Sequence, residues 1–329
     1  VAIGAVGICG SDLAYFAQGR AGGILDIDFE KSLTEGYMGI LGHEAAGTVV
    51  AVGEGVDGFV AGDRVALEAG VSCLRCAQCR AGRYNLCPSV SFLGSYVNRT
   101  PGVLTQVANH SAVFCHKLPA GMSLEQGCMV EPLSVALSGV KRGGVTVGAS
   151  VLITGAGPVG LLTLLACLAA GATTVVVADV VDSKLALATE LGAHAVVDSM
   201  AAPDAVKAAV MAATDGKGAD VAIECSGATP ALHAAIDSTA PGGVVVVVAN
   251  QKASETTIPL QQLCRREIDL RGVYRYCHSY PTAISLLATG KVDVSRLVTH
   301  RFGLEETQAA FEAFKGDAIK IVITPPGME

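Results

Sequence analysis

Hydrophobic and polar positions are most regularly patterned in the middle of the chain, where short apolar runs alternate with helical patterns. Residues 151–154 form an apolar run of strand length, which favours a strand buried in a parallel sheet. A glycine-rich turn and a helical run over 161–170 follow, and Gly171 marks the end of that helix. A second strand is predicted over 174–178, so this stretch forms one strand–helix–strand unit.

The same alternation continues towards the C-terminal end. Further strands are predicted at 195–197, 221–224, 243–248 and 269–273, and helices at 183–191, 205–213, 230–238 and 260–266. With the first two, these strands make six, the number in a complete doubly wound, dinucleotide-binding (Rossmann) sheet. The pattern after Val273 does not extend the sheet convincingly. We therefore predict an α/β fold with a six-stranded parallel sheet and a second domain.

Three glycines after the first strand indicate what this sheet binds. Gly155 permits a tight turn, Gly157 lets a pyrophosphate approach the backbone, and Gly160 lets helix and strand pack closely. The free N–H groups at the start of the helix attract phosphate. Asp179 ends the second strand, where a carboxylate can bind the ribose 2′-hydroxyl. The alternative is a glycine-rich turn without a ligand.

Asp179 also bears on the choice of cofactor. Its carboxylate would repel the 2′-phosphate of NADP, and the next residues, Val180 and Val181, offer no compensating positive charge. This combination favours NAD.

A first candidate metal site lies near the N-terminus. An alternating apolar strand pattern leads into a glycine-rich turn that carries Cys9. A second half-site, with His43 and Glu44, stands at the start of a strand-like run over 48–52. Thiolate, imidazole and carboxylate are the ligand set of a catalytic zinc ion with an open coordination position.

A second candidate site consists of four closely spaced cysteines, Cys73, Cys76, Cys79 and Cys87. Four thiolates within fifteen residues can close a tetrahedron around a structural zinc ion. The alternatives are an iron–sulfur cluster and reduced cysteines without a metal.

Composition narrows the class of protein further. A length of 329 residues favours two domains. The mean hydropathy of +0.49 raises the question of a membrane span, but Gly171 interrupts the most apolar segment, 159–178, which fits a helix and a buried strand better. The net charge of −7 without a basic run argues against nucleic acid as a partner.

The cysteines bear on cellular location. Eleven irregularly spaced cysteines suit a reducing compartment, so we expect a cytoplasmic protein. Because the chain starts at Val1 inside a strand pattern, we expect missing N-terminal residues, which leaves a targeting signal open.

These motifs carry a family resemblance over nearly the whole chain. GICGSD, GHEAAG, the four cysteines, EPLSVAL and GAGPVG stand in the order typical of medium-chain zinc-dependent alcohol dehydrogenases. EPLSVALSGVKRGG and GVYRYCHSYP resemble the polyol branch, which comprises sorbitol, xylitol and L-arabinitol dehydrogenases. The resemblance implies a mainly β, GroES-like catalytic domain over 1–135, a Rossmann domain over 136–272, and a return to the catalytic domain over 273–329.

The resemblance also implies roles around the catalytic zinc. Glu44 and Glu131 compete for the third ligand position beside Cys9 and His43. In sorbitol-dehydrogenase-like enzymes the glutamate matching Glu44 is a ligand and the one matching Glu131 holds the zinc-bound water, whereas in some relatives the latter binds the metal. Ser11 matches the residue that first takes the substrate proton.

Further positions follow from the same matching. The resemblance assigns the cofactor to Gly155, Gly157, Val159, Gly160, Asp179, Lys184, Ala249, Asn250, Gln251, Val273, Tyr274 and Arg275. It assigns the substrate to Tyr15, Phe92, Glu131, Arg275 and Tyr276. The remaining histidines, including His110, His116 and His278, lack ligand spacing and are expected to serve packing or the surface.

Two departures from the family pattern affect the expected reaction. Ala14 stands where relatives carry a proton-relaying histidine, and Cys9 and His43 are several residues further apart than usual because of an insertion around 20–37.

The expected activity is hydride transfer from a polyol hydroxyl to NAD, giving a ketose, in a homotetramer or homodimer. The alternatives are a related dehydrogenase for another alcohol, threonine or an aldose, and a non-catalytic NAD-binding protein.

Overall fold

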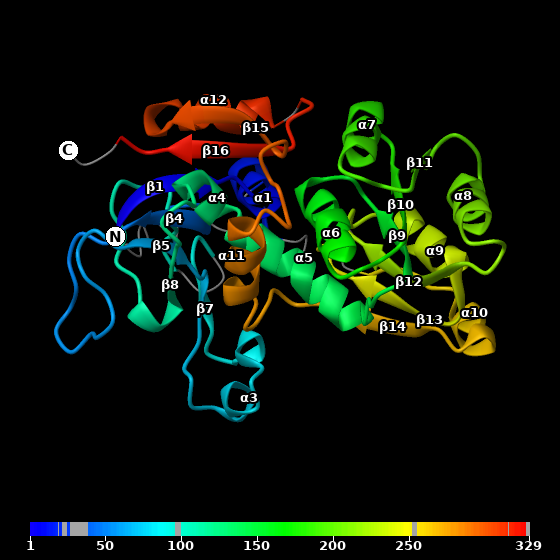
Figure 1. The fold of residues 1–329 in the computed structure, drawn as a ribbon, viewed down its shortest axis with the longest axis horizontal. Coiled ribbons are helices and arrows are strands. Elements are labelled where there is room, and N and C mark those ends of the chain that lie inside the picture. Colours follow the sequence, from blue (N-terminus) through cyan, green and yellow to red (C-terminus); the bar gives the residue numbers. More distant parts are fainter. Residues whose placement is uncertain are drawn as a thin grey trace. The chain divides into compact units, whose positions relative to one another are not determined.

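The computed structural model divides the chain into two compact units (Figure 1). The first comprises Val1–Ser134 and Cys277–Glu329, and the second comprises Val135–Tyr276. The structure describes residues 1–18, 20–21, 25–26, 39–95, 100–251, 255–314 and 316–326. The second unit ends four residues later than the boundary expected after Gly272, because the chain remains paired beyond it: the Val273 N–H donates to the Val247 carbonyl at 3.0 Å.

The second unit is built on a six-stranded sheet in which all neighbouring strands are parallel. Its order is β11 (Ala195–Asp198), β10 (Thr174–Asp179), β9 (Ser150–Thr154), β12 (Ala219–Glu224), β13 (Thr239–Val247) and β14 (Asp269–Gly272). The chain thus starts in the middle of the sheet, builds outwards to β11 and then outwards to β14. This order is that of the doubly wound dinucleotide-binding fold, and the predicted fold class is confirmed.

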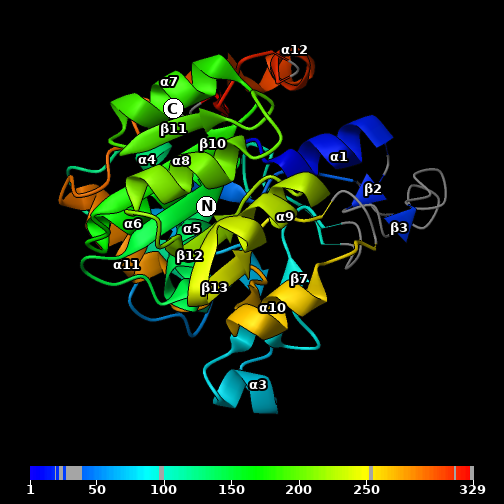
Figure 2. The same cartoon turned by 90° about the vertical axis from the view of Figure 1, so that its right-hand side faces the viewer.

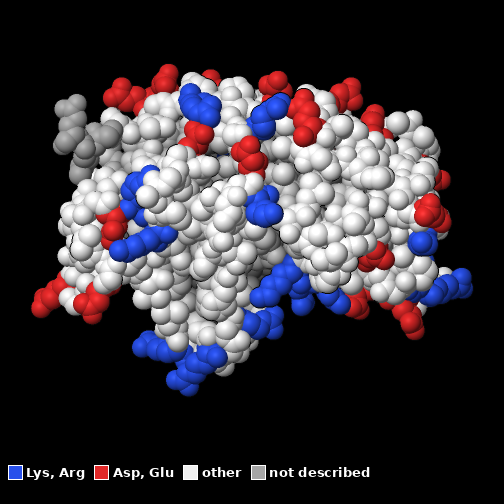
Figure 3. Space-filling view, viewed as in Figure 1, with Lys and Arg blue, Asp and Glu red and all other residues white. Residues whose placement is uncertain are grey.

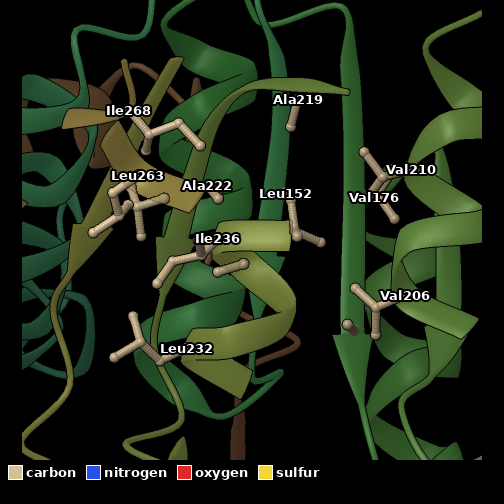
Figure 4. Close-up of a cluster of buried hydrophobic side chains, with 13 residues drawn as sticks. Leu152, Val176, Val206, Val210, Ala219, Ala222, Leu232, Ile236, Leu263 and Ile268 are labelled. Atoms are coloured by element: carbon tan, nitrogen blue, oxygen red, sulfur yellow. The ribbon is translucent and has the colours of Figure 1, made fainter. Parts of the chain in front are cut away.

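Helices cover both faces of this sheet. They are α5 (Val130–Gly143), α6 (Pro158–Ala169), α7 (Asp182–Glu190), α8 (Ala205–Ala213), α9 (Thr229–Ser238) and α10 (Leu260–Arg266). On one face, Leu152 and Ala222 of the strands belong to one buried cluster with Val206 of α8 and Ile236 of α9 (Figure 4). Figure 2 shows α8 and α9 on the near side of the sheet. On the other face, α5 lies so close that a Cβ on Gly143 would approach Val221 within 2.7 Å.

The sheet of the first unit combines strands from both ends of the chain. Its order is β15 (Val298–Gly303), β16 (Lys320–Thr324), β1 (Ala2–Gly7), β4 (Glu44–Thr48), β5 (Arg64–Leu67) and β8 (Cys115–Lys117). Strand β1 lies between β16 and β4 and is antiparallel to both. The C-terminal segment therefore completes the sheet that the N-terminal segment begins.

Shorter elements surround this sheet. The helices are α1 (Gly10–Gln18), α3 (Ala77–Arg80), α4 (Leu124–Cys128), α11 (Tyr280–Ala288) and α12 (Thr307–Ala313). The short strands are β2 (Arg20–Ala21), β3 (Leu25–Asp26), β6 (Gly70–Val71) and β7 (Ser91–Phe92), and the 3₁₀ turns are Tyr84–Leu86, Ala112–Phe114 and Leu304–Glu306.

One strand prediction in this unit is wrong. A strand was expected over 48–52, but β4 spans Glu44–Thr48. The observed segment is the one that can pair on both sides, with β1 and with β5, and Gly47 permits its close approach, since a Cβ there would lie 2.1 Å from the Ala2 carbonyl oxygen. The valines that suggested a strand instead lie beyond its end, where Val50 is 40% exposed.

Two other expectations concern particular segments. The insertion around 20–37 lies outside the described residues, except for the backbone of β2 and β3. Within the described part of the chain, no helix has the length and apolarity needed to cross a membrane, and the apolar segment 159–178 forms most of α6, a turn and most of β10.

Candidate metal centres and dinucleotide site

The first unit brings Cys9, His43 and Glu44 together. Their ligand atoms all lie within 4.8 Å of one another, and the two residues from β4 and its approach are buried. The antiparallel pairing of β1 with β4 causes this meeting, because it sets Gly7 opposite Glu44 and the turn after β1 carries Cys9. One soft thiolate, one imidazole and one carboxylate are thus arranged to hold a zinc ion with a coordination position left for substrate.

The buried carboxylate of Asp12 joins the two halves of this cluster. Its Oδ2 accepts a hydrogen bond from the Cys9 N–H at 2.9 Å, and its Oδ1 accepts one from the Gly42 N–H at 3.1 Å. Oδ1 also lies 3.6 Å from Nδ1 of His43. Burial disfavours the charged imidazolium, but Asp12 and Cys9 outweigh it and raise the pKa of His43 well above its ordinary value. Asp12 is therefore placed to orient His43 for metal binding, and it increases the basicity of the imidazole.

The fully buried ammonium of Lys320 closes the cluster from the other side. Its Nζ lies 2.8 and 2.6 Å from the two carboxylate oxygens of Glu44 and 3.0 Å from the Ile8 carbonyl oxygen. Burial disfavours the charged form, but Glu44 and Cys9 raise the pKa of Lys320. Sequence reasoning missed this residue. The available signal was a lysine at the start of the otherwise apolar run KIVIT.

The other predicted residues of this unit lie as follows. The ring of Phe92 has its centroid 5.2 Å from that of His43. Tyr15 is buried in α1, and Ser11 is half-buried in the first turn of the same helix. Glu131 is buried in the first turn of α5, but its carboxylate is not among the ligand atoms that meet within 4.8 Å. The geometry therefore places Glu44, and not Glu131, with the other two candidate ligands.

The four cysteines form a second cluster around α3. Their Sγ atoms are separated by 3.5 Å (Cys76–Cys79), 3.5 Å (Cys73–Cys87) and 4.0 Å (Cys73–Cys79). Zinc–sulfur bonds of about 2.3 Å give a tetrahedral edge of about 3.8 Å, so the thiols fit a closed zinc site. N–H groups of Arg75 and Cys76 lower the pKa of Cys73 to about 6, which favours the thiolate. Burial and the neighbouring thiols raise the pKa of Cys79 to about 11.

The charges around the four-cysteine lobe, residues 73–87, also suit a closed zinc site. A zinc ion with four thiolates carries a net charge of about −2. Arg75, Arg80 and Arg83 are exposed between the cysteines, and no Asp or Glu occurs between Glu68 and Glu125. Figure 3 shows basic side chains gathered over the region of α3.

A buried carboxylate, Glu68, connects the lobe to the sheet. Its Oε1 accepts a hydrogen bond from the Tyr84 hydroxyl at 2.6 Å, and its Oε2 lies 2.8 Å from Nε2 of His116. Nε2 of His110 lies 3.0 Å from the backbone carbonyl oxygen of Glu68. The Tyr84 hydroxyl accepts a hydrogen bond from the His278 N–H at 2.7 Å. These three histidines thus lie in a packed polar network around Glu68 and Tyr84.

In the second unit, the three glycines form a tight turn between β9 and α6. Gly155 has a φ of +97°, and a Cβ on Gly160 would lie 1.8 Å from the Gly155 carbonyl oxygen. Gly157 is the N-cap of α6, without a side-chain cap, and among the described residues no heavy atom beyond its chain neighbours lies within 4 Å of the position of a Cβ there. The turn therefore leaves open space and uncapped N–H groups at a helix start, which fits a dinucleotide pyrophosphate.

Asp179 ties the end of β10 to this turn. Its Oδ2 accepts from the Ala156 N–H at 2.6 Å, and its Oδ1 accepts from the N–H groups of Val180 and Val181 at 2.8 and 3.0 Å. These bonds fix the position of the carboxylate, and Lys184 follows in α7.

The remaining predicted cofactor and substrate residues lie just beyond strands β13 and β14. Ala249, Asn250 and Gln251 follow β13, and Val273, Tyr274, Arg275 and Tyr276 follow β14. Arg275 has a φ of +55°, its guanidinium lies 4.7 Å from the ring centroid of Tyr274, and Tyr276 is buried.

Comparison with known proteins agrees with both units. Residues 1–120 match the alcohol dehydrogenase GroES-like domain, and residues 158–289 match the zinc-binding dehydrogenase domain. Sorbitol dehydrogenase of Homo sapiens is 43% identical over 320 residues, which cover 97% of this chain and 86% of that protein.

Two solved structures are similar over 99% of this chain and 91% of theirs. One is an Escherichia coli oxidoreductase of unknown specificity involved in membrane biogenesis, with 35% identity and a TM-score of 0.90. The other is a zinc-binding dehydrogenase from Sinorhizobium meliloti bound to NADP, with 30% identity and a TM-score of 0.87.

The chain therefore belongs to the medium-chain, zinc-dependent alcohol dehydrogenases. Within that family it is a zinc polyol dehydrogenase, similar to sorbitol dehydrogenase. The predicted family is confirmed.

Proposed function

We propose that this enzyme oxidises a secondary hydroxyl of a sorbitol-, xylitol- or L-arabinitol-type polyol to a ketose, with NAD as hydride acceptor. The observation that carries the proposal is the meeting of Cys9, His43 and Glu44 in a chain that is 43% identical to a sorbitol dehydrogenase. When bound, the zinc ion lowers the pKa of the substrate hydroxyl as a Lewis acid, and the nicotinamide ring accepts the hydride.

The chain's own residues hold and orient these groups. Cys9, His43 and Glu44 hold the metal, and the position of Glu44 in the cluster supports it over Glu131 as third ligand. Glu131 then orients a water or a substrate hydroxyl. Ser11, in the first turn of α1, accepts the substrate proton. Because Ala14 replaces the family's histidine, the proton leaves Ser11 through water or ribose hydroxyls.

The choice of NAD over NADP depends on Asp179. Three backbone N–H groups hold its carboxylate at the strand end, so the carboxylate cannot easily turn away from a 2′-phosphate. A Sinorhizobium meliloti relative of the same fold is bound to NADP, so the decisive test compares the two dinucleotides. Cofactor reduction should be followed with both dinucleotides on sorbitol, xylitol, L-arabinitol, galactitol, ethanol and threonine. Fastest turnover of ethanol or threonine, or a preference for NADP, would contradict the proposal.

Arg275 offers a sharper test of polyol use. A guanidinium has five fixed donors and can pair the hydroxyls that a polyol carries beyond the reacting one. Arg275→Ala should lower kcat/KM for the best polyol about 100-fold, or about 2.7 kcal/mol, and should lower it much less for 2-butanol, which lacks those hydroxyls. Equal losses on both substrates would mean that Arg275 serves the cofactor or the fold.

The expected assembly follows from the resemblance, and the expected location follows from the irregularly spaced cysteines. We expect a homotetramer or homodimer in the cytoplasm, and light scattering after size-exclusion chromatography would measure the oligomeric state.

A further inference from the structure

The carboxylate of Glu224 is fully buried and has no part in the chemistry above. Glu224 is the last residue of β12, and its exposed fraction is 0%. An ionised carboxylate can remain in such a place only if hydrogen bonds replace its lost hydration. The arrangement of those bonds indicates what the residue does.

One oxygen of this carboxylate shapes the loop that follows β12. Oε1 accepts hydrogen bonds from the Ser226 N–H at 2.7 Å, the Ser226 hydroxyl at 2.6 Å and the Gly227 N–H at 2.8 Å. The Ser226 hydroxyl oxygen in turn accepts from the Ala228 N–H at 3.1 Å. The conformation of residues 225–228 is thus fixed from the end of the preceding strand.

The other oxygen reaches the loop that follows the next strand. Oε2 accepts from Nε2 of Gln251 at 2.9 Å. The two loops also touch along their backbones, because Gly227 has a φ of +71° and a Cβ there would lie 2.4 Å from the Asn250 carbonyl oxygen. Glu224 therefore joins the loop 225–228 to the loop 249–251.

Both loops belong to the edge of the sheet that carries the glycine turn. The Cys225 N–H donates to the Thr154 carbonyl oxygen at 2.8 Å, and a Cβ on Gly155 would lie 2.9 Å from the Ser226 nitrogen. The side-chain oxygen of Gln251 is buried without a hydrogen-bond partner among the described residues. A buried acceptor of this kind gains when a ligand supplies an N–H donor.

We propose that Glu224 and Gln251 form a latch, defined by the hydrogen bond between their side chains, that positions these two loops to bind the dinucleotide. Glu224 is a positioning residue, which acts through the loops, and Gln251 is held with its carboxamide oxygen available to the cofactor. This inference rests on the proposed use of NAD or a related dinucleotide.

The test uses three variants of the full-length enzyme. Gln251→Leu removes the latch without changing the net charge and should raise the Kd for NADH about tenfold, or about 1.4 kcal/mol. Gln251→Glu sets a second carboxylate against Glu224 and should raise it further. The double variant Glu224→Gln, Gln251→Glu restores a donor and an acceptor with the original net charge, and should bring the Kd back to within about threefold of the original value.

Two measurements test the latch. The fluorescence of bound NADH gives the Kd, and hydrogen exchange of the cofactor-free enzyme reports the loops directly. In Gln251→Leu, the amides of residues 226–228 should exchange faster, whereas those of the distant strand β11 should not change.

A matched control separates positioning from general stability. Thr239 is buried at the opposite end of β13, where its hydroxyl donates to the Ala235 carbonyl at 2.7 Å. Thr239→Val should lower thermal stability and leave the Kd for NADH unchanged. The latch would be refuted by a Kd for Gln251→Leu within twofold of the original value, or by a double variant that binds no better than Gln251→Glu. If the unaltered enzyme binds neither NADH nor NADPH, the proposed function itself is wrong, and the exchange measurement still tests the latch.

Discussion

The two candidate metal clusters lie in the same unit but are built in opposite ways. The four cysteines come from fifteen consecutive residues, and three of them are only half-buried. The cluster of Cys9, His43 and Glu44, with its neighbours Asp12 and Lys320, draws on segments far apart in the sequence. His43, Glu44, Asp12 and Lys320 are all buried. Backbone N–H groups support the first cluster, whereas charged side chains support the second.

This difference distinguishes residues that suit a structural metal ion from residues that suit a catalytic one. A closed set of four thiolates leaves no position for a substrate and stabilises its lobe. A three-residue set of mixed chemistry can leave one position open, and Asp12 and Lys320 lie where they can set the charge and orientation of His43 and Glu44. Each of the following changes should therefore affect one cluster far more than the other.

The largest effect is expected at Cys9. Cys9→Ser replaces a thiolate ligand and should abolish turnover, because the substrate oxygen loses its Lewis acid. Steady-state kinetics and NADH titration should show no turnover with an unchanged Kd for NADH, and metal analysis should find about one zinc ion per chain instead of two. A normal kcat would overturn the assignment.

The reciprocal change is Cys79→Ser in the four-cysteine lobe. Three remaining thiolates hold zinc poorly, and metal binding is coupled to local folding. The lobe should lose its zinc ion and become sensitive to protease, and the melting temperature should fall by about 10 °C or more. Turnover per intact molecule should persist at low temperature. A stable, fully active variant with one zinc ion would show that the lobe is dispensable.

A third effect is expected at Lys320. Lys320→Met leaves the buried Glu44 carboxylate without its cation and should lower the free energy of unfolding by about 3–5 kcal/mol, measured by urea denaturation. The loss should be larger without zinc, because the metal itself supplies positive charge. The surface pair Lys117–Asp63, at 2.8 Å, provides the control: Lys117→Met should lower the free energy of unfolding far less, because solvent screens this exposed pair. Equal effects of the two substitutions would contradict this account of Lys320.

The smallest effect is expected at Tyr84, which ties the lobe to Glu68. Tyr84→Phe leaves a buried carboxylate oxygen short of one donor and should cost about 1–3 kcal/mol. It should also speed hydrogen exchange in residues 73–87. The control, Tyr280→Phe, removes a buried hydrogen bond to the Leu67 carbonyl at 2.9 Å and should leave exchange in the lobe unchanged. If both variants alter the lobe alike, Tyr84 has no special role there.

Local patterns made the second unit largely predictable. The helices at 205–213 and 260–266 have the predicted bounds, because propensity, turn signals and burial agree in these segments. In the first unit the strand after His43 was displaced, since pairing with both β1 and β5 selected Glu44–Thr48 over the more apolar valines. Likewise, the spacing of the four cysteines can be seen within one segment. The contact of Lys320 with Glu44 joins residues 276 positions apart, and the run KIVIT marks the lysine as unusual without indicating its partner.

The place of β16 beside β1 has a consequence for synthesis. The chain is made from its N-terminal end at about 5–20 residues per second, so about 14–55 s pass between the addition of Glu44 and that of Lys320, 276 residues later. During this time β1 has only one of its two partner strands, and the Glu44 carboxylate lacks its cation. The four-cysteine lobe can close much earlier on the ribosome. The cation that pairs with Glu44 in the cluster assigned to catalysis is therefore made only after the whole dinucleotide unit.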